Sequence, residues 1–355
     1  MNRDAKVMPT ESQVQFRLES DETHDFTSKA FHLLCDHSRI TAFQSPQWLD
    51  LFYSKLVPSL GAQPLVLKIY IGDSCHPDVV IPLVRERYYG FHILQPADLG
   101  VADYNAIIGS NESLTRLAET PGFKEQLIEA LQPFDLLLFR KQRQDVFDVG
   151  RLFAEVSRSL NINSAYDVNI GEGYENWLKT CVSKNSRSGL RRKRNAFGKE
   201  VGKLEYVSLS NAKEIHHAFK AMRELRSARF ENDLLSKPEY FDFYLKMAEL
   251  GAEKGDAVTF VGLWNDQIMS IDFGLRCNGR FLLLLGAFSG AEHHQRYSLG
   301  LLGLTELIRQ ETARGTQIFD FTIGDEPYKR TFGAEKVALH NVSVINGLRG
   351  QAAFA

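Results

Sequence analysis

The chain has 355 residues, of which 44% are hydrophobic and 24% are charged, and its 42 basic and 44 acidic side chains give a formal charge of -2. This composition is typical of a soluble globular protein, and the length exceeds what one hydrophobic core usually serves, so we expect two domains. The balanced charge argues against a dedicated nucleic-acid binder unless basic residues cluster locally.

The cysteines and the first residues indicate a compartment. Cys35, Cys75, Cys181 and Cys277 are far apart and form no CxxC pair, which favours unpaired thiols in a reducing compartment over disulfides or a zinc site. Residues 1–13 are polar, have no apolar core for a signal peptide, and are expected to be disordered. No run approaches the ~18 apolar residues of a membrane span. We therefore expect a cytoplasmic protein that uses no metal.

The first half of the chain, residues 14–165, alternates strand and helix patterns. The predicted elements are a strand over 14–18, helices over 26–35 and 46–56, strands over 64–71, 79–85 and 88–94, a helix over 112–131, a strand over 135–140, a helix over 149–160 and a strand over 164–170. Ser45 and Pro46 are suited to the N-cap and first position of their helix. The less regular segment 95–105 holds Asp98, Asp103 and Tyr104. If this segment is only a connecting loop, its acidic side chains would cap helices or face water.

The second half begins with a predicted helix over 173–181 and a strongly basic stretch over 183–203. Eight basic residues there stand against one acid, Glu200, and the apolar stripe is thin, so we expect a surface helix with a cationic face. Three interpretations stay open. The face is only solvated, or it binds nucleic acid, or it binds the phosphates of a cofactor or of a nucleotide- or lipid-linked acceptor through Arg191 and Arg192.

Two further helices are predicted over 212–230 and 238–254. Arg223, Arg226 and Arg229 lie three residues apart on one side of the first. They are expected either to pair with acids of neighbouring helices or to reach an acceptor across a cleft.

The stretch 256–333 is the most informative part of the chain. Antiparallel strands are predicted over 257–264, 267–276 and 280–287, and a helix starts at residue 299. Ser298 can cap this helix, and Gly300 would let the first turn approach a ligand closely. A strand, a loop and a helix start in this order are suited to binding phosphate. Strands over 316–322 and 336–345 follow, the last closing the second sheet.

This order of elements resembles the acyl-CoA-binding half of the GNAT (Gcn5-related N-acetyltransferase) superfamily. The run 319–322 (FDFT), followed by 324–326 (GDE) and 328–329 (YK), further resembles the cellulose-biosynthesis-type acetyltransferases, a double-GNAT family related to Fem-type peptidoglycan aminoacyl transferases. The resemblance implies an α/β (α+β mixed) fold of two tandem GNAT-like domains, residues 14–165 and 166–355, each a mostly antiparallel mixed sheet flanked by helices. The superfamily's usual Arg/Gln-x-x-Gly-x-Gly/Ala loop is not kept, since Gln295 and Arg296 precede only Gly300.

The resemblance also implies roles for individual residues. Tyr328 is expected to protonate the departing thiolate, and Asp320, Asp325 and Glu326 are further candidates for proton transfer. Burial would raise the pKa of Asp320 toward that of a useful base, unless Asp320 only pairs with Lys329 or Arg330. Acyl-CoA contacts are expected from Phe288, Gln295, Arg296, Ser298, Leu299, Gly300 and Leu301. Acceptor contacts are expected from Asp98, Asp103, Tyr104, Arg191, Arg192, Arg229 and Lys329.

These features predict an acyltransferase that moves an acetyl or longer acyl group from acyl-CoA to an amine or hydroxyl of a sugar or of an envelope or exopolysaccharide precursor. One alternative is a Fem-type transferase that takes an amino acid from aminoacyl-tRNA and binds the tRNA backbone on its basic helix. The other is a non-catalytic GNAT-fold subunit of a polysaccharide biosynthesis complex.

Overall fold

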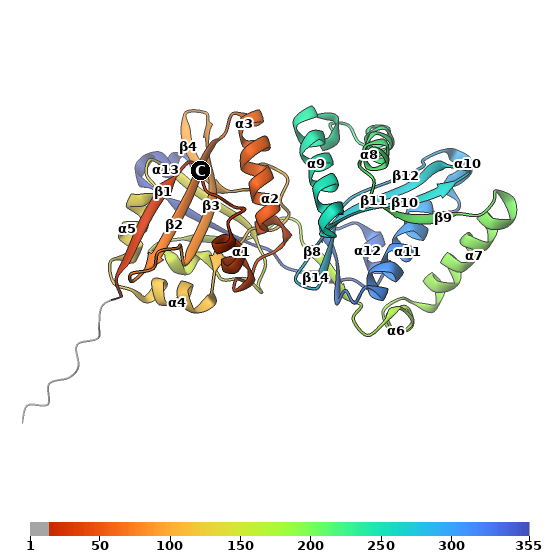
Figure 1. Ribbon diagram of the computed structural model, residues 1–355, viewed down its shortest axis with the longest axis horizontal. Coiled ribbons are helices and arrows are strands. Elements are labelled where there is room, and N and C mark those ends of the chain that lie inside the picture. Colours follow the sequence, from red (N-terminus) through yellow and green to blue (C-terminus); the bar gives the residue numbers. More distant parts are fainter. Residues whose placement is uncertain (1–13, 355) are drawn as a thin grey trace, which may run out of the picture.

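The computed structural model describes residues 14–354 and contains two mixed sheets, each flanked by helices (Figure 1). The expected disorder of residues 1–13 lies outside the described residues. No helix between residues 14 and 354 combines the length and the apolarity needed to cross a bilayer. The predicted α/β class with two mixed sheets is confirmed.

The first sheet has the strand order β1-β2-β3-β4-β6-β15-β7, and β5 pairs with β3. Only β4 and β6 run parallel among these pairs. Its strands are β1 (Phe16–Asp21), β2 (Gln63–Ile71), β3 (Val79–Tyr88), β4 (Phe91–Pro96), β5 (Ile108–Gly109), β6 (Leu136–Gln142), β7 (Ser157–Leu160) and β15 (His340–Ile345). Its helices are α1 (Lys29–Asp36), α2 (Pro46–Leu51), α3 (Val57–Leu60), α4 (Asn111–Glu119), α5 (Phe123–Ala130) and α13 (Gly347–Phe354).

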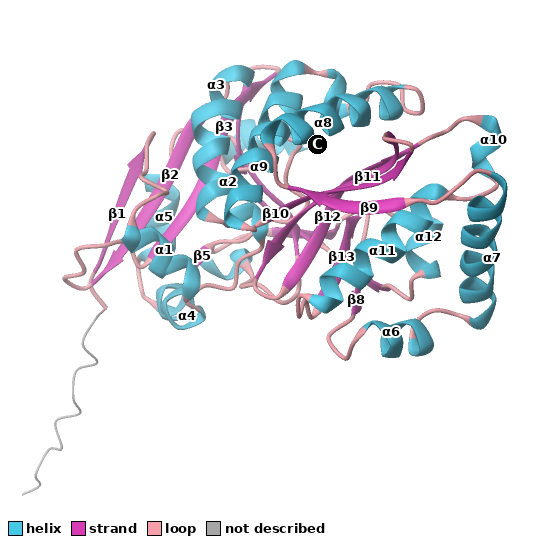
Figure 2. Cartoon of the chain, turned by 45° about the vertical axis from the view of Figure 1, so that its right-hand side comes forward, coloured by secondary structure: helices cyan, strands magenta, loops and turns pink. Residues whose placement is uncertain are grey.

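The second sheet has the strand order β14-β8-β13-β12-β11-β10-β9, in which only β12 and β13 run parallel. Its strands are β8 (Ala165–Asn169), β9 (Glu205–Leu209), β10 (Ala257–Trp264), β11 (Gln267–Cys277), β12 (Arg280–Phe288), β13 (Ile318–Ile323) and β14 (Glu335–Val337). Its helices are α6 (Tyr174–Thr180), α7 (Lys184–Glu200), α8 (Ala212–Ser227), α9 (Pro238–Lys254), α10 (Glu292–Gln295), α11 (Leu299–Ala313) and α12 (Pro327–Thr331). Figure 2 shows α8 and α9 on one face of this sheet and α11 and α12 on the other.

The two sheets repeat one pattern and are joined by two crossings of the chain. In each, four antiparallel strands are followed by a fifth that runs parallel to the fourth, and a sixth antiparallel strand lies beside it. The sixth strand of the first sheet is β15, from the end of the chain, whereas the sixth strand of the second sheet is β8. Residues 161–164 and 338–339 therefore both cross between the sheets, which straps the two halves together.

Four local predictions differ from the structure. The helix expected over 112–131 is two helices, because Gly122 takes a left-handed conformation (φ 77°) between them. The helix expected over 149–160 is a 3-10 turn (Val149–Leu152) followed by β7, which pairs with β15 far along the chain. The strand β9 was not expected. The last strand, expected to close the second sheet, is divided between β14 in the second sheet and β15 in the first.

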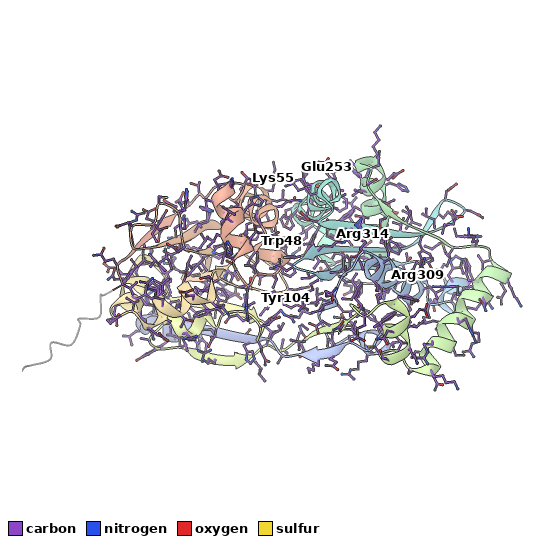
Figure 3. The ribbon with its side chains drawn as sticks, turned by 60° about the horizontal axis from the view of Figure 1, so that its bottom comes forward. Trp48, Lys55, Tyr104, Glu253, Arg309 and Arg314 are labelled. Carbon is purple, nitrogen blue, oxygen red and sulfur yellow. The ribbon has the colours of Figure 1, made fainter. Side chains whose placement is uncertain are left out.

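The halves meet through a continuous apolar core. Its largest cluster of buried side chains takes members from α1 and α2 in the first half and from α8 and α9 in the second. The Trp48 ring lies edge-on to Phe243, with centroids 4.9 Å apart, and the Tyr244 hydroxyl donates to the Val101 carbonyl at 3.2 Å. The expected cap of α2 is confirmed, since the Ser45 side chain accepts the Trp48 N–H. Figure 3 labels Trp48 and Tyr104 near this junction.

Removing residues 338–355 should unfold the first half, because β15 lies between β6 and β7. The deletion removes the fully buried Val342 and Val344, each worth about 1.5–3 kcal/mol of burial, and leaves β6 without a neighbour on one side. We expect loss of cooperative thermal unfolding of the first half, measured by circular dichroism and limited proteolysis. A chain ending at Asn346, which keeps β15, is the control and should lose less. A deletion variant that melts like the parent would show that β15 is dispensable.

Candidate active site

The parallel pair β12 and β13 comes apart at its centre. The strands pair only from Arg280 with Ile318 to Leu282 with Asp320, and β12 then continues to Phe288 without β13 beside it. The Leu283 carbonyl accepts the Thr322 hydroxyl at 2.8 Å instead of a backbone amide. We call this point the vertex. The backbone edge of β12 beyond it has no strand beside it, although the Gly286 carbonyl there accepts the Arg226 guanidinium at 3.1 Å.

Two irregularities of the backbone lie at the vertex. The β11–β12 register shifts so that Phe273 pairs with Leu285 and Gly274 with Leu283, which leaves Leu284 as a bulge. Thr322 has a φ of 57°, a left-handed conformation that is a genuine outlier for a β-branched residue. Bulges and strained residues both concentrate at functional sites. The vertex is therefore the first candidate for a reaction centre.

We call the separation of β12 from β13 beyond the vertex the splay. The start of α11 lies beyond the free edge of β12, at what we call the mouth of the splay. The N–H groups of Leu301 and Leu302 donate to the Ser298 carbonyl. No hydrogen bond found among residues 14–354 uses the N–H of Leu299 or Gly300, so these two amides are the free donors of the helix start. The predicted helix start is confirmed.

Ser298 does not cap this helix with its side chain, contrary to the prediction. It lies in a left-handed conformation at the N-cap position, and its hydroxyl oxygen accepts the Lys193 ammonium of α7 at 2.6 Å. The tertiary contact with α7 takes the hydroxyl that a local cap would have used. It also places a lysine beside the free amides of α11.

Gly300 is required by packing, not by open space for phosphate. A side-chain carbon at this position would lie 2.6 Å from the Phe288 ring. The other face of the mouth carries Arg229, whose guanidinium lies 4.2 Å from the centre of the Phe288 ring. Gln295 donates to the Gly290 carbonyl within its own loop, and Arg296 pairs with the adjacent Tyr297 and with Glu200 at the end of α7.

The helix α7 stands against α11 with part of its charge satisfied. Arg187 donates to three carbonyls at the end of α6, and Arg194 lies 3.6 Å from Glu306. Arg191 and Arg192 are exposed. A cavity of about 450 Å³ lies between α6, α7 and α11, with Tyr174, Leu178 and Leu190 as apolar lining and basic side chains around them.

Asp320 is fully buried and holds the two halves together. Its Oδ1 accepts the Tyr104 hydroxyl at 2.7 Å and the Thr322 N–H at 2.8 Å. Its Oδ2 accepts from Arg143 at 3.2 Å and from Arg280 at 3.1 Å. As expected, burial raises the pKa of Asp320, although Arg143 and Arg280 lower it. Four donors surround the carboxylate, so Asp320 acts as a structural anchor. The expected pairing with Lys329 or Arg330 is wrong, because the arginines come from β12 and from the loop after β6.

The other candidates around the β13–α12 turn are placed apart from the vertex or are engaged. Lys329 is buried and donates to the carbonyls of Thr322, Ile323 and Gly324, with Glu326 2.9 Å away. Asp325 is exposed and accepts the Tyr166 hydroxyl. Lys329 therefore fixes the backbone that follows Thr322.

The loop over residues 97–105 of the first half reaches the vertex. Asp98 is buried against Lys141, at 2.9 Å, and braces the loop. Asp103 is partly buried and lies close to the Thr322 side chain. Burial raises the pKa of Asp103 from 3.8 to about 6, although Lys141 and Thr322 lower it. A carboxyl with this pKa can accept a proton near neutral pH.

Tyr328 lies on α12, partly buried, with its ring edge-on to Phe321 of β13 at 6.1 Å between centroids. Burial and the charges of Glu326 and Asp272 raise the pKa of the Tyr328 hydroxyl. It therefore keeps its proton at neutral pH and can donate it.

Sequence reasoning missed four residues at or beside the vertex: Thr322, Arg143, Arg280 and Asp272. Two of the charged ones carried a signal. Asp272 and Arg280 stand within strands whose other residues are mostly buried, where a charged side chain needs a partner or a purpose. Thr322 carried none, because its strained backbone follows from contacts with Asp320 and Leu283.

Arg143→Met should destabilise the protein by about 3–5 kcal/mol, because it leaves the buried Asp320 carboxylate short of a partner. The measurement is the urea dependence of unfolding. Lys203→Met, which removes the exposed pair with Glu205, is the control and should change stability by less than about 1 kcal/mol. If both variants unfold at the parent's urea concentration, Arg143 is not needed to hold Asp320.

The sequence of the second half matches a known family. Residues 184–330 match the family described as "Acetyltransferase (GNAT) domain". No curated protein matches the chain in sequence.

Solved structures share the fold at low identity. The chain is similar to the crystal structure of FemX, at 11% identity over 95% of this chain and 98% of that one, with a TM-score of 0.63. It is similar to L-PGS from Bacillus licheniformis, at 11% identity over 87% of this chain and 89% of that one, with a TM-score of 0.55. A tandem GNAT protein from the clavulanic acid biosynthesis pathway has 10% identity over 93% of this chain and 98% of that one, with a TM-score of 0.51.

The match to a tandem GNAT protein agrees with the two repeated sheets. The chain therefore has a GNAT-type fold similar to that of FemX, and residues 184–330 match the acetyltransferase (GNAT) domain family.

Proposed function

We propose that this protein is an acyltransferase that moves an acyl group from acyl-CoA to an amine or hydroxyl of a saccharide or envelope precursor. The observation that carries the proposal is the splay itself. An open strand edge leads from the strained vertex to a helix start whose amides are free. This arrangement suits a ligand with an extended amide-bearing arm and phosphates at its far end.

The open edge of β12 supports binding of the arm of acyl-CoA. Backbone groups on the β13 side of residues 284–288 have no strand beside them. An extended ligand with its own amides can pair with them as an added strand, except at the Gly286 carbonyl, which accepts the Arg226 guanidinium. The phosphates would then meet the free amides of Leu299 and Gly300 and the ammonium of Lys193. Phe288 and Arg229 would flank the arm at the mouth.

The proton steps have candidates on both sides of the vertex. As the nucleophile attacks the thioester carbonyl, Asp103 would take its proton. The backbone N–H of the bulged Leu284 is a candidate donor to the developing oxyanion. The C–S bond then breaks, and Tyr328 would give its proton to the thiolate. Asp103 and Tyr328 come from different halves, so the acceptor would enter between the halves.

A second candidate function is aminoacyl transfer from tRNA. The observations that favour it are the FemX-like fold and the exposed Arg191 and Arg192 on α7, which could contact a nucleic-acid backbone. A non-catalytic subunit remains the alternative if neither donor binds.

Lys193→Ala should weaken acetyl-CoA binding about tenfold, or ~1.4 kcal/mol, because it removes the charge beside the α11 amides. Isothermal titration measures the dissociation constant. Lys199→Ala, on the same helix at an exposed position, is the control and should bind like the parent. In a parallel arm, uncharged tRNA should not raise the melting temperature of the parent, whereas acetyl-CoA should. Stabilisation by tRNA and not by acyl-CoA would replace this proposal with the second function.

Asp103→Asn should lower kcat at least a hundredfold and remove the rise of activity with pH. The raised pKa means that Asp103 is protonated and inactive below about pH 6 and ionised above it, so the parent's rate should increase through pH 6 and then level off. The rate of CoA release against a panel of amino sugars gives the profile. Asp73→Asn, in an exposed turn of the first half, should keep the parent profile. A profile that survives in Asp103→Asn would exclude Asp103 as the base.

A further inference from the structure

Asp272 is a buried carboxyl without a partner. It lies in the middle of β11 and is 5% exposed. Its Oδ2 makes no hydrogen bond, and no ion pair among residues 14–354 uses the side chain. A buried polar group without a hydrogen bond costs about 1–3 kcal/mol, and more if it is charged. Such a group is rare in a native protein and needs an explanation.

Two glycines lie beside this carboxyl. A side-chain carbon at Gly286 of β12 would meet only one atom within 4 Å, the Asp272 Oδ1 at 3.1 Å. A side-chain carbon at Gly303 of α11 would lie 3.4 Å from Asp272 Oδ2 and 2.8 Å from the Ser270 hydroxyl. Room therefore remains beside Gly286, and the carboxyl borders it.

This space adjoins the splay. Gly286 is paired with Asp272 across the strands, and it lies on the part of β12 that has already separated from β13, between the vertex at Leu283 and the mouth at Phe288. A negative charge on Asp272 also helps to raise the pKa of the Tyr328 hydroxyl. An acyl group held near the vertex would thus have Asp272 within its surroundings.

The Ser270 hydroxyl lies near Asp272 but makes no hydrogen bond to its Oδ2. The sheet neighbours opposite Asp272 are Phe260 on β10 and Gly286 on β12, and neither side chain can donate a hydrogen bond. Burial alone raises the pKa of Asp272 well above 3.8. The carboxyl group beside Gly286 can accept a hydrogen bond and, when protonated, donate one.

We propose that Asp272 selects acyl groups that carry a hydroxyl or an amino group. This polar group would lie in the space beside Gly286 and form a hydrogen bond with Oδ2 of Asp272. The inference rests on the proposed acyl-CoA function and names the class of acyl donor. A site with a buried polar group discriminates strongly against a ligand that leaves this group unpaired. A plain acetyl or alkyl chain would leave Asp272 unpaired, whereas a hydroxyacyl or aminoacyl group would satisfy it.

The test compares four thioesters on the protein as it exists: acetyl-CoA, butyryl-CoA, 3-hydroxybutyryl-CoA and β-alanyl-CoA. Isothermal titration of the parent should show at least tenfold tighter binding of one of the last two than of butyryl-CoA. This comparison needs no variant. Butyryl-CoA binding as tightly as both polar thioesters would overturn the inference and leave the proposed function intact. No binding of any thioester would remove the proposed function, and the inference with it.

Two variants separate the ligand classes. Asp272→Leu should lose the preference and bind butyryl-CoA at least as tightly as the polar thioesters. Asp272→Asn should keep a preference for the hydroxyacyl group and lose one for the amino group, because the amide accepts a hydrogen bond but cannot become an anion. Asp266→Asn, in the exposed turn before β11, should bind like the parent. A preference that survives in Asp272→Leu would show that another group selects the acyl chain.

Discussion

The buried carboxylate of Asp320 is the contact on which the geometry of the site depends. Tyr104 and Arg143 approach it from the first half, and Arg280 and the Thr322 amide approach it from the second. A charge taken out of water is tolerated only when its partners are all in place. The loop containing Tyr104 must therefore lie against the end of β13, which also brings Asp103 to the vertex.

The same contacts force β12 and β13 apart. The Thr322 N–H donates to the Asp320 carboxylate and is therefore not available for strand pairing. The Thr322 hydroxyl donates to the Leu283 carbonyl. Lys329 holds the strained turn from the other side by binding three successive carbonyls. The strain at Thr322 is therefore sustained by several hydrogen bonds that would be lost if the backbone relaxed. Its result is an edge of β12 with no strand beside it, on which Arg226 donates to the Gly286 carbonyl and a ligand could supply partners to the other backbone groups.

The sixth strands of the two sheets hold the two halves of the molecule in a fixed relative position. Because β15 completes the first sheet and β8 completes the second, the chain passes twice between the halves. The apolar contact of α2 with α9 adds to this on the other side. Groups contributed by different halves, such as Asp103 and Tyr328, can then keep a constant relation to each other, which proton transfer at one carbonyl requires.

The sequence alone predicted the antiparallel β10–β11–β12 meander, the basic helix and the start of α11, because each follows from local periodicity and turn residues. The class of the fold followed from the resemblance to GNAT proteins, which is strongest over residues 256–333 and is equally local. Tertiary structure alone decided which side chains satisfy one another across long separations. In the folded chain Asp320 pairs with Tyr104 and two arginines instead of Lys329. The Ser298 hydroxyl accepts from Lys193, and β15 pairs within the first sheet. The tertiary structure also left Asp272 unpaired. These outcomes depend on which distant segments meet, and buried polar groups take the partners that packing brings to them, so no pattern within a segment could show them.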